Sequence, residues 1–173
     1  MQFLNAHSSN SKPHFECGFK CHKSENSLII DFKIKAKESE FFYSEKFVKD
    51  SLENWGLWDY DVIEVFLSSS KSAPYLEIQL SPLNQKFALI IDEPRAKHHY
   101  PEWKDFKATS QLDENVWRGQ LEIEFNKIPN FDGFIFANVF TILGEAREYY
   151  ALNPNPEIAP DHHRPELFKE LAC

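Results

Sequence analysis

Apolar and polar side chains alternate with a period of two from Leu28 onward. Between residues 28 and 37 the apolar side chains fall on one face, and lysine and aspartate fall on the other. This pattern predicts a half-buried antiparallel strand. Six further stretches also predict strands, at residues 61–67, 75–80, 86–92, 117–125, 134–143 and 149–152. Helical periodicity is weak throughout, so the chain is expected to be all-β, an antiparallel β-sandwich.

The remaining segments are expected to be irregular. Residues 1–26 are polar, and residues 93–115 read as a long loop. A chain of 173 residues suits one domain. We therefore expect an N-terminal polar segment, 1–26, and a sandwich domain, 27–173; the sequence leaves open whether the first segment packs on the second.

Composition and net charge reduce the number of function classes and partners that the chain could have. Aromatic residues make up 15% of the chain, which favours sheets, and no glycine-rich phosphate loop occurs among its 5 glycines. The chain carries 19 Lys and Arg against 27 Asp and Glu, a net charge of −8. A field of that sign repels phosphate, so nucleic acids and anionic membranes are disfavoured as partners. The oligomeric state stays open.

The first residues of the sequence indicate a cellular location, and the cysteines raise the question of metal binding. The first residues contain no basic region followed by an apolar stretch, so a cytoplasmic location is expected. Three cysteines cannot all pair with one another. His14, Cys17, Cys21 and His22 offer enough donors for tetrahedral zinc, but their spacing matches no common zinc finger. Isolated cysteines or one oxidised pair are favoured instead, and no metal site is predicted.

A row of polar side chains interrupts two of the predicted strands. Glu64 lies within an apolar strand, and Tyr75, Glu77 and Gln79 share one face of the next. If the two faces adjoin, they offer convergent hydrogen-bonding groups; the plainer alternative is a solvated sheet face. A carboxylate at position 64 is costly to bury unless it is paired. Glycoside hydrolysis by Glu64 and Glu77 needs two carboxyl groups about 5–10 Å apart across a cleft; neighbouring strands could supply the distance, but a compact sandwich has no obvious long cleft, so hydrolysis is disfavoured.

Three segments carry a resemblance to a known family: Gly56–Leu67, Tyr75–Pro82 and the tail from Tyr149 to Phe168, with its Pro160-Asp-His-His-Arg-Pro165 run. Together they resemble the DOMON-like family, and within it the branch related to family 9 carbohydrate-binding modules. The resemblance implies an immunoglobulin-like or jelly-roll-like sandwich of about ten strands with a ligand at one face or end.

The resemblance also implies roles for individual residues. Sugar-binding relatives clamp a glucose-like ring between two aromatic side chains, and here Trp58 matches the first. The second would be Tyr149 or Tyr150. Glu64 matches a family carboxylate and His163 a family histidine. Where these relatives carry an arginine, this chain has Glu77 or Gln79.

We expect a non-catalytic module that binds a carbohydrate by aromatic stacking and polar contacts, without a cofactor. The alternatives are a haem-binding domain and a protein-interaction or structural domain. Met1 is the only methionine, which disfavours a His–Met haem. The candidate ligand-binding residues are Trp58, Glu64, Tyr75, Glu77, Gln79, Arg95, Asn138, Tyr149, Tyr150 and His163.

Overall fold

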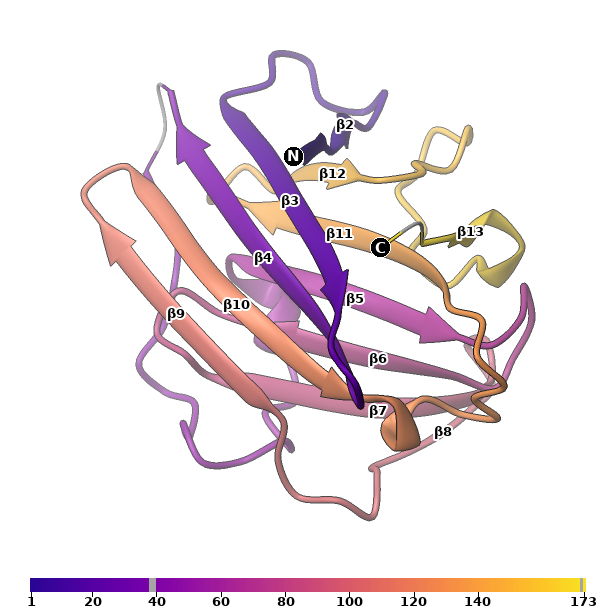
Figure 1. Cartoon of the computed structure of the whole chain (residues 1–173). Helices are drawn as coiled ribbons and strands as arrows, with labels where there is room; N and C mark the ends of the chain where they lie inside the picture. Colours follow the sequence, from indigo (N-terminus) through magenta and orange to yellow (C-terminus); the bar gives the residue numbers. More distant parts are fainter. Residues whose placement is uncertain (38–39, 172) are drawn as a thin grey trace.

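The computed structural model describes residues 1–37, 40–171 and 173, which form an antiparallel β-sandwich of two sheets (Figure 1). The first sheet has the order β1-β3-β4-β10-β9. Its strands are β1 (Gln2–Phe3), β3 (Phe15–Lys23), β4 (Ser27–Ala36), β9 (Lys107–Asp113) and β10 (Val116–Glu124).

The second sheet has the order β2-β12-β11-β5-β6-β7-β8, and β13 also pairs with β11. Its strands are β2 (Asn5–Ala6), β5 (Val62–Ser68), β6 (Tyr75–Leu80), β7 (Lys86–Glu93), β8 (Lys97–His99), β11 (Phe136–Leu143), β12 (Glu148–Ala151) and β13 (Lys169–Glu170). Three short 3₁₀ helices complete the regular structure of the described residues, at Leu57–Asp59, Phe125–Lys127 and Pro165–Leu167. None of them has the length and apolar character needed to span a bilayer. The predicted all-β sandwich is confirmed.

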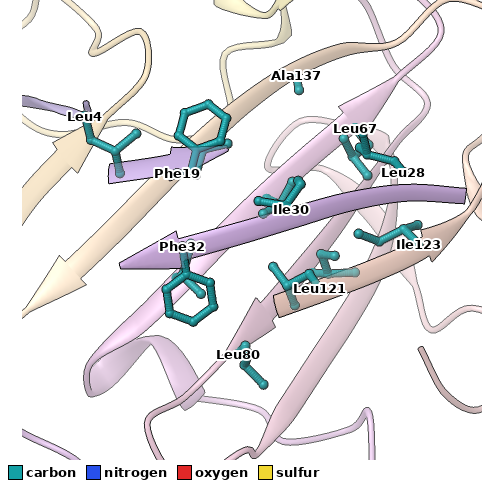
Figure 2. Close-up of a cluster of buried hydrophobic side chains, with 14 of the residues drawn as sticks. Leu4, Phe19, Leu28, Ile30, Phe32, Leu67, Leu80, Leu121, Ile123 and Ala137 are labelled. Carbon is teal, nitrogen blue, oxygen red and sulfur yellow. The ribbon is translucent and has the colours of Figure 1, made fainter. Parts of the chain in front are cut away.

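The main core lies between the two sheets (Figure 2). Every second residue of β4 from Leu28 to Ala36 is buried there, as the alternation predicts. Leu67, Leu80 and Ala137 of the second sheet belong to the same cluster. Burying one face of each sheet in this way provides most of the apolar area that drives folding.

The second sheet is also covered on its outer face. Both β5 and β6 are buried at every position, although a half-solvated strand would alternate. A second apolar cluster accounts for this burial, and it includes Phe66 and Tyr75 from the strands and Phe168 from the C-terminal tail. Polar side chains on this face are therefore enclosed by covering segments, which places Glu64 and Glu77 in the protein interior.

Two segments expected to be irregular form strands. Within residues 1–26, β3 pairs along its length with β4 and contributes Phe15, Cys17 and Phe19 to the core. Its apolar signal is weak in the sequence, because two of the inward-facing positions are Cys17 and Cys21. Within residues 93–115, β8 and β9 lie at the edges of their sheets. An edge strand carries many polar residues, so its apolar signal is weak.

Two of the three cysteines form a disulfide, and none of them belongs to a zinc site. Cys21 and Cys173 form a disulfide across 152 residues, and Cys17 is free and buried. His14 bonds to Glu148, with 2.5 Å between Nδ1 and Oε1. The zinc alternative is thus wrong for these residues, and the described part of the chain contains no group of three or more His, Cys, Asp or Glu able to hold a metal ion.

Candidate functional site

A cavity of about 440 Å³ opens on the outer face of the second sheet. This volume falls within the range of small-molecule sites. Strands β5, β6, β7, β8, β11 and β12 contribute its lining, together with the loop before β5, the turns that carry Arg95 and Arg147, and the C-terminal tail. We call this cavity the outer-face pocket.

The floor of the outer-face pocket is polar and buried. Glu64 on β5 lies opposite Gln79 on β6, and Glu77 is the next residue on the same face of β6. Their exposed fractions are 2%, 1% and 4% for Glu64, Gln79 and Glu77. Gln79 donates from Nε2 to Oε1 of Glu77 at 2.7 Å, which leaves Gln79 Oε1 buried without a hydrogen-bond partner. Such an orphaned acceptor is costly unless a ligand or water supplies a donor.

The C-terminal tail brings two histidines onto this floor. His162 Nδ1 lies 2.6 Å from Oε2 of Glu64, and its ring stacks on Phe140 with 4.0 Å between centroids. His163 Nδ1 lies 2.7 Å from the hydroxyl of Tyr75. Burial lowers the pKa of His163, so its imidazole is neutral at pH 7 and Nδ1 accepts a hydrogen bond from the Tyr75 hydroxyl. The proton on Nε2 then points toward Glu77, whose Oε2 is 3.9 Å away.

Asparagine side chains hold the tail in this position. Asn138 on β11 donates from Nδ2 to the Asn153 carbonyl at 2.8 Å and accepts from the Asn153 amide at 3.0 Å. Asn155 donates to the Ala159 carbonyl and accepts from the Asp161 amide. These bonds satisfy backbone groups that a buried loop would otherwise leave unpaired.

Two tryptophans form one wall of the outer-face pocket. Gly56 lies between Trp55 and the 3₁₀ turn at a φ of 84°, a conformation that glycine adopts without strain. The turn places Trp55 edge-on to Trp58, with 4.9 Å between ring centroids. Trp58 also packs on Phe87, whereas Trp55 is 56% exposed and stacks on His98. An exposed indole beside a pocket offers a flat apolar surface to a ligand.

Charged side chains surround the rim. Arg95 forms an ion pair with Asp161, which ties the β7–β8 turn to the tail. Arg147 donates from Nε to the hydroxyl of Tyr149 at 3.1 Å and lies over that ring. Tyr149 and Arg147 thus line the pocket together from the β11–β12 side. Four carboxyl groups and two arginines line the pocket in all, which gives it an acidic balance.

The environment of Glu77 changes its protonation. Burial raises its pKa, and the charge of Glu64 raises it further, to about 8. The hydrogen bond from Gln79 favours the ionised form but is outweighed. Glu77 therefore holds a proton at pH 7 when the pocket contains no ligand.

Seven of the ten candidate residues line the outer-face pocket: Trp58, Glu64, Glu77, Gln79, Arg95, Tyr149 and His163. Their role in ligand binding stays a prediction. Tyr75 lies beneath the pocket and orients His163, while Asn138 positions the tail. Tyr150 points to the main core instead, where its hydroxyl bonds to Glu148. Consecutive strand residues face opposite sides, so only one of the two tyrosines can reach the pocket.

Sequence reasoning missed several pocket residues. Trp55 lies three positions before Trp58 in the sequence, but it precedes the 3₁₀ turn, and its approach to Trp58 depends on the left-handed backbone of Gly56. His162 was not among the candidates, yet it lines the pocket beside His163 because the tail is irregular there. Nothing in the sequence indicated that Arg147 lines the pocket. The residue lies in a turn, at a φ of 56°, and a turn has no periodicity that predicts where its side chains point.

Comparisons with known proteins identify relatives by sequence and solved structures with the same fold. No family model matches the chain. A mouse protein called UPF0462 protein C4orf33 homolog is 34% identical over 130 residues, which cover 67% of this chain and 62% of the mouse protein. Its human counterpart is 32% identical over 127 residues, which cover 66% and 60%. The chain thus spans about three fifths of the length of these curated relatives, whose names state no ligand or activity.

Solved structures share the sandwich. A protein from Bacteroides uniformis, described as a putative carbohydrate-binding protein, superposes with a TM-score of 0.72 at 16% identity, covering 98% of this chain and 84% of the other. A family 9 carbohydrate-binding module from Caldicellulosiruptor kristjanssonii in complex with glucose gives 0.61 at 15% identity, covering 96% and 82%. The chain has the fold of these carbohydrate-binding modules. At such identities the likeness concerns the fold, and the more specific DOMON-like resemblance stays a prediction.

Proposed function

We propose that this chain is a non-catalytic carbohydrate-binding module that holds a sugar in the outer-face pocket. The observation that carries the proposal is the wall formed by Trp55 and Trp58 beside the buried polar floor of Glu64, Glu77 and Gln79. Sugar recognition requires this combination, because C–H faces stack on aromatic rings while hydroxyl groups need directed partners. The fold shared with carbohydrate-binding modules supports the proposal.

The arrangement of the carboxyl groups favours binding over hydrolysis. A glycosidase places its two carboxyl groups on either side of the scissile bond. Glu64 and Glu77 instead lie on one face of adjacent strands, and both are part of the same floor. Glu64 is also held by His162, and Glu77 by Gln79. These side chains are positioned to accept hydrogen bonds from one side of a bound ligand.

A thermal-shift screen against mono- and oligosaccharides tests the proposal. A sugar present at about 100 times its dissociation constant stabilises the folded protein by about 2.7 kcal/mol. We expect Trp58→Ala to reduce the shift, because that substitution removes half of the aromatic wall. Phe134→Ala is the matched control, since Phe134 is 56% exposed and lies outside the pocket. If no sugar shifts the wild type, the proposal is wrong; if Trp58→Ala keeps the shift, the ligand binds elsewhere.

A further inference from the structure

The hydrogen-bonding capacity of the pocket floor is unbalanced toward acceptors. Glu64 and Glu77 together present four carboxyl oxygens; hydrogen bonds with His162 and Gln79 use one oxygen of each, and Oε2 of Glu77 lies 3.9 Å from Nε2 of His163. Gln79 Oε1 is buried in the same place without a donor. Even with the proton that Glu77 holds at pH 7, acceptors outnumber donors on this floor, so it is completed by a ligand that brings several donors to a small region.

A metal ion is a poor candidate for this role. Metal ions take up carboxylate clusters, yet the described residues hold no group of three or more His, Cys, Asp or Glu arranged for coordination. Oε2 of Glu64 is moreover engaged by the His162 imidazole at 2.6 Å, so a metal ion would find only the other oxygen of this carboxylate free. The donors are expected to come from an organic group.

A single hydroxyl group cannot supply hydrogen bonds to all the acceptors on the floor. It donates one proton and presents lone pairs to the other acceptors, whereas a protonated primary amine has three donors and no acceptor. Gln79 Oε1 and one oxygen from each of Glu64 and Glu77 offer three acceptors on adjacent positions of β5 and β6. We propose that the ligand of the outer-face pocket is an amino sugar, whose protonated amine binds among Glu64, Glu77 and Gln79. This inference rests on the proposed function and specifies its ligand class.

The surrounding charges are compatible with a cation at the floor. The nearest guanidinium groups lie at the rim, where Arg95 is neutralised by Asp161 and Arg147 is bonded to Tyr149. The neutral His163 adds no positive charge near Glu77. The titratable and charged groups that line the pocket around Glu77 are Glu64, Glu93, Arg95, His98, Arg147, Tyr149, Asp161, His162 and His163. Among these, carboxyl groups outnumber arginines, so the pocket attracts a cation.

The proposal carries a protonation signature. Without ligand, Glu77 holds a proton at pH 7 because of burial and the neighbouring Glu64 charge. An ammonium group bound beside it favours the carboxylate, so the proton leaves when the amine enters. A neutral sugar gives no such driving force, because the proton of Glu77 then remains useful as a donor to a sugar oxygen. Amine binding and neutral-sugar binding thus differ in proton release as well as in affinity.

Titration calorimetry of the full chain tests this inference. The probes are glucosamine, galactosamine and mannosamine, each compared with its neutral parent hexose and its N-acetyl derivative, near pH 7 in two buffers of different ionisation enthalpy. We expect at least one free amine to bind about tenfold or more tighter than its parent, the gain of a charged over a neutral hydrogen bond. We also expect about one proton to be released per amine bound.

A matched pair of variants locates the effect. Glu77→Gln keeps an acceptor for Gln79 but cannot ionise, so it is expected to lose both the amine preference and the proton release. Glu16→Gln, an exposed position on β3 of the other sheet, is expected to keep both. Equal binding of hexosamine and parent hexose, or no proton release by the wild type, overturns the amine assignment and leaves the proposed function standing. If neither neutral nor amino sugars bind, both proposals fail.

Discussion

His162 Nδ1 lies 2.6 Å from Oε2 of Glu64, although the two residues are 98 positions apart in the sequence. The contact joins the C-terminal tail to the floor of the outer-face pocket. It also explains how a carboxylate that is 2% exposed can be accommodated within an apolar strand, because burial of such a group requires a partner. The pocket is therefore built by the tail as much as by the sheet.

Removal of this partner is expected to destabilise the fold. His162→Ala leaves the buried Glu64 oxygen without its donor and exposes one face of Phe140, on which the ring stacks. We expect the free energy of unfolding to fall by about 1–3 kcal/mol, measured by urea denaturation. His99→Ala is the control, because His99 is exposed on edge strand β8. An unchanged stability in His162→Ala would show that Glu64 finds another partner.

Substitutions of the two tryptophans of the pocket wall are expected to affect ligand binding and folding stability to different degrees. Trp55 is 56% exposed, whereas Trp58 packs on Phe87 with 5.3 Å between ring centroids. Trp55→Ala is therefore expected to weaken sugar binding about 3- to 10-fold, which corresponds to one aromatic contact, with little change in melting temperature. Trp58→Ala is expected to lower both. The measurements are calorimetric titration and thermal unfolding of each variant. Equal binding by Trp55→Ala and wild type would exclude Trp55 from the site.

The alternation of apolar and polar residues in the central strands was enough to predict the β-sandwich. The same alternation predicted which polar side chains share the face that forms the pocket floor. Glu64, Glu77 and Gln79 were assigned to one face because strand periodicity fixes which side chains share a face. The tail and the loops have no such periodicity. The joint approach of His162, Arg147 and the Trp55 ring depends on irregular backbone and on contacts between distant segments, which a local pattern does not encode.

The disulfide between Cys21 and Cys173 is expected to contribute to stability but not to ligand binding. It closes a loop of 152 residues, so its loss enlarges the conformational freedom of the unfolded chain. The double variant Cys21→Ser/Cys173→Ser is expected to lose about 2–5 kcal/mol in the free energy of unfolding. Sugar affinity should change little, because β13 and the buried Phe168 still anchor the tail to the sheet.

Denaturation with and without reductant checks this prediction. Reductant should lower the stability of the wild type to that of the double variant and leave the variant itself unchanged, because the remaining Cys17 is free. A wild type insensitive to reductant would mean that the two thiols are not joined. Disulfides persist mainly in oxidising compartments, which counts against the expected cytoplasmic location; that location stays a prediction.

The buried Glu77 should make stability fall as pH rises. Its pKa is about 8 in the folded protein against 4.5 for an ordinary glutamate, with burial as the main cause. Between these values the folded state binds more protons than the unfolded state, so the free energy of unfolding decreases with rising pH. The stabilisation is fully present below about pH 4.5 and is lost as the pH passes through 8. Glu77→Gln is expected to flatten this decline, as measured by urea denaturation from pH 5 to 9.

Asp61 titrates in an overlapping range and must be separated from Glu77. Burial raises its pKa to about 7, against the lowering effect of hydrogen bonds from the Phe42 and Gly144 amides. The Asp61 contribution is present in both wild type and Glu77→Gln, so the difference between their pH profiles isolates Glu77. Glu16→Gln should reproduce the wild-type profile, since its side chain is exposed on β3. Parallel profiles for wild type and Glu77→Gln would mean that Glu77 is ionised throughout this range, and the expected proton release on amine binding would be lost with it.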